Sequence, residues 1–195
     1  MRREPASLTA LILALGLAAP VAAAPKKPKY FITFRETLEA PGLVTGVKDK
    51  VKPLLLDELR KYPEFVLDLP DAPQDPEGLK AYFKKHKLKG YEINIRLTKL
   101  VQKVIPPKPG ERFKTLAITI AATIFGTSFP DKSFAVGGDG ESTVEFHVRQ
   151  ESQRDVDVAK NDALKDAIQQ AVVKTLRQLE VGQMVPKPEK SRRKK

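Results

Sequence analysis

The chain contains no cysteine among its 195 residues. This absence excludes a disulfide framework and also the acylated cysteine of a lipoprotein. The two histidines, His86 and His147, lie 61 positions apart and do not form a zinc motif. A G-x-S-x-G nucleophile motif and a phosphate-binding loop are absent as well. We therefore predict no metal, no cofactor and no catalytic residues, and a protein that is not an enzyme.

No apolar run in the sequence is long enough to cross a membrane. The run from Leu8 to Ala19 has about a dozen residues, whereas a spanning helix needs ~20. It follows Arg2 and Arg3 and precedes the small residues 21–24, which is the layout of a cleavable secretion signal. We expect cleavage after Ala23 and a protein of the periplasm or the secreted fraction, without a transmembrane segment. An uncleaved membrane anchor is the alternative.

The net charge of +11 lies mainly at the two ends of the chain. Nine of these charges fall outside residues 30–181, so the central segment is nearly neutral and does not predict a nucleic-acid interface. The basic ends are candidates for contact with anionic lipid or polysaccharide, although a tail of this kind can also serve only solubility. The candidate contacts in the tail are Lys187, Lys190, Arg192, Arg193, Lys194 and Lys195.

These features predict four segments. Residues 1–23 form the signal peptide and residues 24–29 a basic linker. Residues 30–181 form one α+β domain, and residues 182–195 a disordered basic tail.

Hydrophobic periodicity predicts the first elements of the domain. Alternation predicts a half-buried strand at 30–35, and helical spacing predicts a helix at 51–62 that tolerates Pro53 only in or near its first turn. A second strand is expected at 65–69 and a short helix at 77–86.

Longer strands are expected next. Tyr91, Ile93, Ile95 and Leu97 alternate with polar residues, and the run 113–125 does the same, which predicts a long hairpin. A further strand pair is expected at 133–136 and 142–148. The glycine-rich residues 137–140 are expected to be its turn.

The strongest periodic pattern lies near the end of the chain and predicts a long amphipathic helix packed on one face of the sheet. Residues 152–155 have capping chemistry, so Asp155 and Asp157 are interpreted as first-turn acids. A calcium loop that also uses Asp162 is the alternative. The apolar stripe comprises Val156, Ala159, Ala163, Leu164, Ala167, Ile168, Ala171, Val172, Thr175, Leu176 and Leu179.

The predicted fold is therefore α+β, with a mostly antiparallel sheet of about five strands, a short helix pair and the long C-terminal helix. This order resembles the small periplasmic domain of three bacterial families: the penicillin-binding-protein activator lipoprotein B, the Tol system's periplasmic protein B, and the curli secretion lipoprotein. The segments that carry the resemblance are 30–35, 51–69, 90–97 and 159–179. The resemblance implies a non-catalytic envelope module that docks onto other proteins.

We therefore expect an adaptor or assembly module that binds other envelope proteins through a sheet edge or an exposed hairpin. The alternatives are a protein that adheres to anionic envelope surfaces through its basic ends, and an enzyme whose site is invisible in sequence. The lysines around His86 are interpreted as solvated helix-end cations, with an anion site as the alternative. The candidate protein-binding surface is the solvent face of the sheet, with Glu92, Asn94, Arg96, Thr98, Glu145, His147 and Arg149. The alternatives are a polar face that only meets water and a binding site at the proline-rich turn 106–112.

Overall fold

The computed structural model describes residues 28–110, 112–130, 132, 134–149 and 152–181. The elements in chain order are β1 (Tyr30–Glu39), α1 (Lys48–Leu59), β2 (Phe65–Val66), α2 (Pro76–His86), β3 (Lys89–Ile105), β4 (Lys114–Phe129), β5 (Phe134–Val148) and α3 (Gln153–Val181). The five strands form one sheet in the order β2-β1-β3-β4-β5. The predicted α+β class is confirmed.

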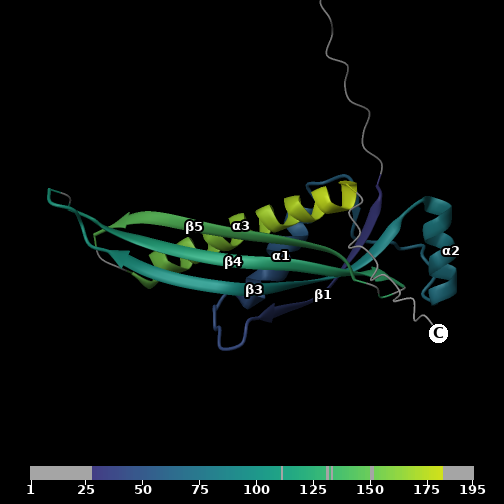
Figure 1. Ribbon diagram of the computed structural model, residues 1–195, viewed down its shortest axis with the longest axis horizontal. Coiled ribbons are helices and arrows are strands. Elements are labelled where there is room, and N and C mark those ends of the chain that lie inside the picture. Colours follow the sequence, from purple (N-terminus) through teal and green to yellow (C-terminus); the bar gives the residue numbers. More distant parts are fainter. Residues whose placement is uncertain (1–27, 111, 131, 133, 150–151, 182–195) are drawn as a thin grey trace, which may run out of the picture.

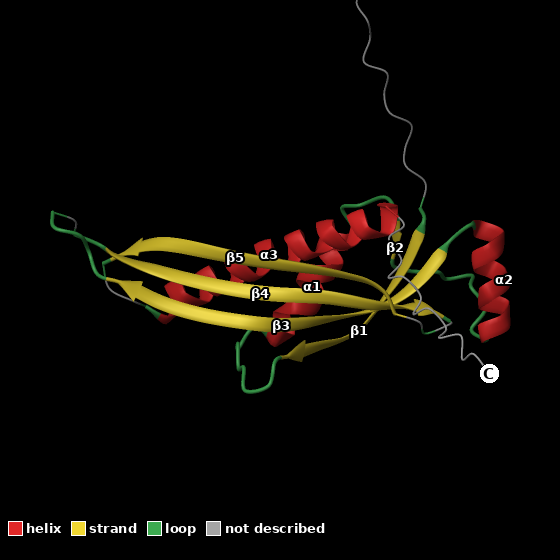
Figure 2. Ribbon diagram, in the orientation of Figure 1, coloured by secondary structure: helices red, strands yellow, loops and turns green. Residues whose placement is uncertain are grey.

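The sheet is mixed but mostly antiparallel. β1 pairs in parallel with both β2 and β3, and the longer β3–β4 and β4–β5 pairings are antiparallel. Figure 1 shows β3, β4 and β5 running along the long axis of the molecule, with α3 beside them and α2 at one end. Figure 2 shows α1 and α3 on the same side of these strands.

The core lies between the sheet and the helices α1 and α3. Ile93, Ile95 and Leu97 on β3 and Leu116 and Ile118 on β4 are at most 1 % exposed, because alternate residues of each strand face the helices. The long β3–β4 hairpin is confirmed, and both strands are longer than predicted.

The long helix α3 packs its predicted stripe against the sheet. Ten residues of the stripe, from Val156 to Leu176, are buried, and Leu179 packs at the border of the core. The hydroxyl oxygen of Ser152 accepts the backbone N–H of Asp155 at 3.2 Å, and Asp155 Oδ2 accepts the Ser152 hydroxyl at 2.7 Å. The predicted capping role of this segment is confirmed.

The prediction of a glycine turn at 137–140 is wrong, because β5 runs unbroken through these residues. A Cβ on Gly138 would lie 2.3 Å from the carbonyl oxygen of Ala171, and one on Gly140 would lie 1.9 Å from that of Ala167. Both glycines therefore allow the backbone of α3 to approach the backbone of β5.

Two boundaries near the start of the domain also differ from the prediction. β2 has only two residues instead of the five of 65–69, because only Phe65 and Val66 pair with β1, at Tyr30 and Phe31. α1 begins at Lys48, so Pro53 is the sixth helical residue and lies in the second turn rather than the first. Pro53 faces solvent there, away from the core side that carries Val51 and Leu55.

Candidate protein-binding surface

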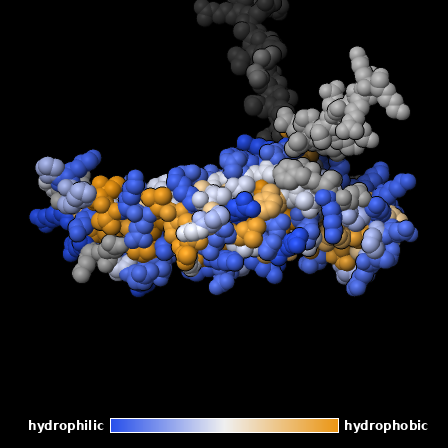
Figure 3. Space-filling view, turned by 60° about the horizontal axis from the view of Figure 1, so that its bottom comes forward, coloured by the Kyte–Doolittle hydropathy of each residue, from blue (hydrophilic) through white to orange (hydrophobic). Residues whose placement is uncertain are grey.

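The sheet face opposite α1 and α3 is referred to here as the open face. Its β4 residues are small or polar at alternate positions, including Thr115, Thr119 and Thr123, because this side meets solvent. In Figure 3 apolar and hydrophilic side chains are interspersed along the visible surface, without one continuous apolar region.

The seven predicted surface residues separate into two groups on the open face. Glu92, Asn94, Arg96 and Thr98 lie on β3, whereas Glu145 and His147 lie near the end of β5, followed by Arg149. Across β4, Arg96 is aligned with Asp139, which is six residues before Glu145. Six residues of strand span about 20 Å. The structure therefore does not bring the seven residues into one site.

The β3 group is engaged with its own sheet. The Arg96 guanidinium lies 5.3 Å from the ring centre of Phe125 on β4. Thr98 Oγ1 donates to the Ala121 carbonyl oxygen at 3.4 Å, beside the irregularity between Leu97 and Lys99. Asn94 Oδ1 is buried and has no hydrogen-bond partner among the described residues.

The β5 group borders a hollow. Arg149 lies 5.3 Å from the ring centre of Phe113, and His147 Nδ1 lies 3.3 Å from Thr115 Oγ1. Next to them is a groove of about 440 Å³ between the end of β5 and the start of α3, called the strand-end groove below. Its lining residues are Phe146, His147, Val148, Arg149, Asp155 and Val158.

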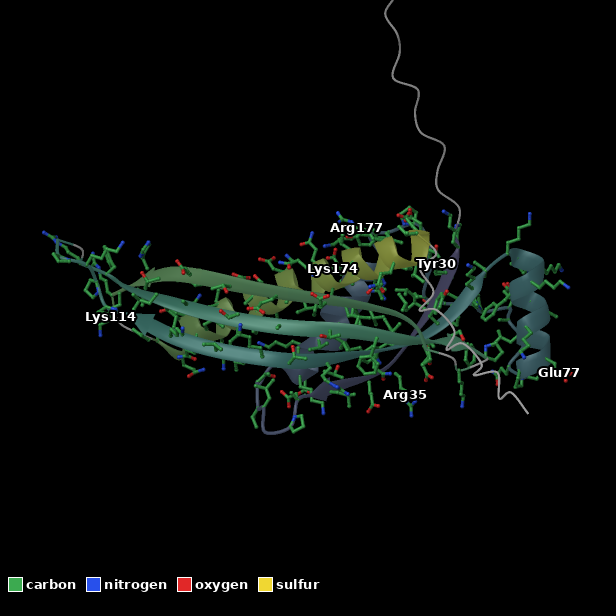
Figure 4. The ribbon with its side chains drawn as sticks, viewed as in Figure 1. Tyr30, Arg35, Glu77, Lys114, Lys174 and Arg177 are labelled. Atoms are coloured by element: carbon green, nitrogen blue, oxygen red, sulfur yellow. The ribbon has the colours of Figure 1, made fainter. Side chains whose placement is uncertain are left out.

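β5 is an edge strand, and α3 covers only part of its outer edge. The backbone N–H of Gly137 donates to Gln178 Oε1 at 3.0 Å, and Lys174 Nζ donates to Asp139 Oδ2 at 2.6 Å. Figure 4 shows Lys174 on α3 beside the strands. The hydrogen bond from Lys174 holds the pKa of the Asp139 carboxyl below its usual value. These contacts protect the edge near Gly137 and Asp139.

The remaining part of the β5 edge carries backbone groups that point outward. The backbone N–H of Gly137 points away from β4, toward Gln178. Because the pairing with β4 is regular from Gly137 to Val148, the backbone N–H and C=O groups of every second residue after Gly137 also point away from β4. The backbone groups of Thr143, Glu145 and His147 therefore face the free edge, next to the strand-end groove. Sequence analysis expected a sheet edge or an exposed hairpin to bind a partner, but it could not locate this edge because it divided β5 at its glycines.

The other predicted residues are placed as follows. His147 is exposed on its strand, as expected. Of the two predicted first-turn acids, Asp155 lies in the first turn of α3, whereas Asp157 is the fifth residue of the helix and its Oδ1 accepts Gln153 Nε2 at 2.9 Å. Among the described residues no group of three or more histidine, aspartate or glutamate side chains is arranged to hold a metal ion. In the same part of the chain no helix is long and apolar enough to span a membrane.

The signal segment 1–23 lies outside the described residues, as do Lys187, Lys190, Arg192, Arg193, Lys194 and Lys195. Their predicted roles stay predictions.

Comparison with known proteins gives likenesses of structure only. No family model matches the sequence, and no curated protein matches it either. A Helicobacter pylori homolog of a neuraminyllactose-binding hemagglutinin has a TM-score of 0.47 and 8 % identity, with 80 % of this chain and 89 % of that chain covered. A Xanthomonas campestris protein has a TM-score of 0.46 and 11 % identity, with coverages of 83 % and 92 %.

A minor lipoprotein from Acinetobacter baumannii is also similar, with a TM-score of 0.39 and 6 % identity over 80 % of this chain and 93 % of that one. Several of the similar structures are thus bacterial lipoproteins. The names of these three proteins do not place them in the families that the sequence resembles, so that resemblance stays a prediction. Likenesses of this size do not define a function.

Proposed function

We propose that this protein is an exported, non-catalytic envelope module that binds an extended segment of another envelope protein along the free edge of β5. The observation that carries the proposal is the outward direction of the backbone groups of Thr143, Glu145 and His147 on a long edge strand. Such an edge can accept an added strand, whose backbone supplies the hydrogen bonds.

The strand-end groove supplies a place for side chains of the added strand. Phe146 and Val148 form part of its lining, and Val158 on α3 is 44 % exposed beside them. Alternate side chains of a strand point to opposite faces, so every second residue of the partner would face this groove. The proposed partner segment therefore carries an apolar residue at the position that meets Val158.

The acidic side chains on this edge favour a partner strand with basic residues. Glu141 and Glu145 are exposed on β5. Glu141 Oε1 accepts Lys99 Nζ at 2.6 Å, whereas no ion pair involving Glu145 is found among the described residues. Opposite charges on neighbouring strands stabilise the pairing.

Substitution of Glu145 by proline tests the proposal. Proline removes the outward N–H of Glu145 but no hydrogen bond to β4, so the variant is expected to fold. Glu145→Ala is the matched control, because it removes the same carboxylate and keeps the N–H. In pull-downs from envelope extracts, we expect Glu145→Ala to retain its partner and Glu145→Pro to lose it. Equal capture by both variants would show that the edge is not used.

A further inference from the structure

A second groove lies at the other end of the molecule, where α2 ends and β1 begins. Its volume is about 680 Å³, within the range of sites that hold small molecules. Figure 4 places Glu77 of α2 at this end and Lys114 at the opposite end. Lys114 pairs with Val148, which lines the strand-end groove. The groove at the α2 end is called the lysine groove below. Its lining residues are Pro28, Lys29, Val66, Lys85, His86, Lys87 and Leu88.

The fold fixes the positions of these residues. Lys87 ends α2 in the left-handed conformation with φ of 55°, and the following N–H of Leu88 donates to the Phe83 carbonyl oxygen at 2.9 Å. The N–H of Lys89 donates to the Lys29 carbonyl oxygen at 2.9 Å, which holds the end of α2 beside the start of β1. The lysines of the groove therefore come from two segments that are joined by the sheet.

Within the described part of the chain, no ion pair balances the charge of the lysine groove. No carboxylate is among its lining residues, and Lys29, Lys85 and Lys87 form no ion pair with any described residue. The carbonyl end of α2 offers about half a negative charge, which is much less than three ammonium groups carry. An anionic group bound here would be stabilised by all three lysines.

The same groove has an apolar floor. Val66 and Leu88 are partly buried and line the groove together with Pro28 and the lysines. The ring of His86, whose centre lies 4.3 Å from that of Tyr82, also lines the groove. A simple anion would leave this apolar surface in contact with water, whereas an alkyl chain would cover it.

We infer that the lysine groove binds an anionic amphiphile, with a phosphate or carboxylate head held by Lys29, Lys85 and Lys87 and an alkyl chain placed on Val66 and Leu88. The site lies far from the free edge of β5. It can therefore be tested, and can fail, separately from the proposed protein-binding function.

Titration of the purified full chain with dodecyl phosphate below its micellar concentration tests the inference. Inorganic phosphate presents the head alone, and dodecyl maltoside presents the chain with an uncharged head. We expect saturable binding of dodecyl phosphate, with methyl chemical-shift changes at Val66 and Leu88, and at least about tenfold weaker binding of either comparison compound. If inorganic phosphate binds as tightly, the groove is a plain anion site; if dodecyl maltoside does, it is a plain apolar one. Either result overturns the inference.

A pair of double variants locates the binding. Lys29→Gln with Lys87→Gln removes two cations of the groove, and Lys84→Gln with Lys114→Gln removes two exposed lysines outside it. Because one cation near an anionic group changes affinity about fivefold, the first pair is expected to weaken binding of dodecyl phosphate about tenfold or more. The second pair is expected to change it less than about twofold. Equal losses in the two double variants would assign the binding to general charge and overturn the inference, as would the absence of binding.

Discussion

Gly140 of β5 lies directly against the carbonyl group of Ala167 on α3, so closely that a Cβ built on Gly140 would be 1.9 Å from that oxygen. Gly138 has the same relation to Ala171, one helical turn further along α3. The two pairs bring the helix and strand backbones together, which allows Leu164 and Ile168 to be fully buried beneath them.

Substitution of Gly140 by alanine tests this contact. The added methyl group meets backbone atoms that cannot rotate away, so α3 has to move from the sheet. We expect the free energy of unfolding to fall by about 3 kcal/mol or more, as for overpacking that the core cannot relax. Denaturant unfolding provides the measurement. Gly137→Ala is the control and is expected to change stability by less than about 1 kcal/mol, since its Cβ would meet only the Ile124 carbonyl oxygen at 3.3 Å. Equal effects at both glycines would contradict the close packing.

The loop after β1 is held by Glu39 and Thr45. Glu39 Oε1 accepts the Thr45 hydroxyl and, at 2.9 Å, the Thr45 backbone N–H, which together lower the pKa of Glu39. Thr45→Val removes the bond from the hydroxyl. We expect the free energy of unfolding to fall by about 1–2 kcal/mol at neutral pH, and the pKa of Glu39 to be higher in the folded variant than in the wild type.

The pH dependence of this loss follows from the sign of the Glu39 shift. A carboxylate with a lowered pKa stabilises the fold above its unfolded value, here about 4.5, and this contribution disappears as pH falls through the folded value. The difference between wild type and Thr45→Val is therefore expected to shrink in acid. Unfolding measured from neutral to acidic pH checks this, and a constant difference would contradict it.

Because of three tyrosines near the start of the sheet, we expect the fold to become less stable at alkaline pH. Burial raises the pKa values of Tyr30, Tyr62 and Tyr91 above 10.0, and nearby carboxylates add to the effect at Tyr30 and Tyr62. A raised pKa contributes stability that is present below the unfolded value and is lost as pH rises through the folded value. We expect unfolding to become easier above pH ~10 and Tyr91→Phe to move the alkaline midpoint upward. Tyrosinate absorbance measures the ionisation of the tyrosines as the pH rises. If all three ionised near pH ~10 in the folded protein, their pKa values would not be raised and the prediction would be contradicted.

The side chain of Gln178 is predicted to protect one amide on the edge of β5. In Gln178→Ala the N–H of Gly137 loses its 3.0 Å bond to Oε1 and faces water. We expect amide hydrogen exchange at Gly137 to accelerate about tenfold, with global stability changed by less than about 1 kcal/mol. Arg177→Ala, one residue earlier on an exposed site of α3, is the control and is expected to leave that amide unchanged.

The long elements could be predicted from sequence because their periodicity is strong. The stripe from Val156 to Leu179 marks one face of α3, and the alternation from Tyr91 to Leu97 and from Leu116 to Ile120 marks the core face of β3 and β4. Each pattern indicates, from neighbouring residues alone, which side of the helix or strand is buried.

The features that depend on partners distant in sequence could not be predicted. In the sequence, Gly138 and Gly140 are typical of a turn, and only their contacts with Ala171 and Ala167 show that they lie in a strand packed against α3. The two glycines are two residues apart, so both lie on the strand face that meets the helix. The same error hid the free edge of β5. Residues such as Glu92 and Glu145 share the open face, but only the strand register shows that they lie in separate groups.

Site-specific photo-crosslinking in the intact envelope tests the central claim most directly. The backbone of Glu145 faces the free edge, so a photoreactive side chain at position 145 lies beside the proposed added strand. Glu36 is also exposed but lies on β1, away from the β5 edge. We predict a crosslinked product of one defined mass from position 145, formed with a different protein, and none of that mass from position 36. The same product from both positions, no product from position 145, or a product made only of two copies of this chain would contradict the proposed function.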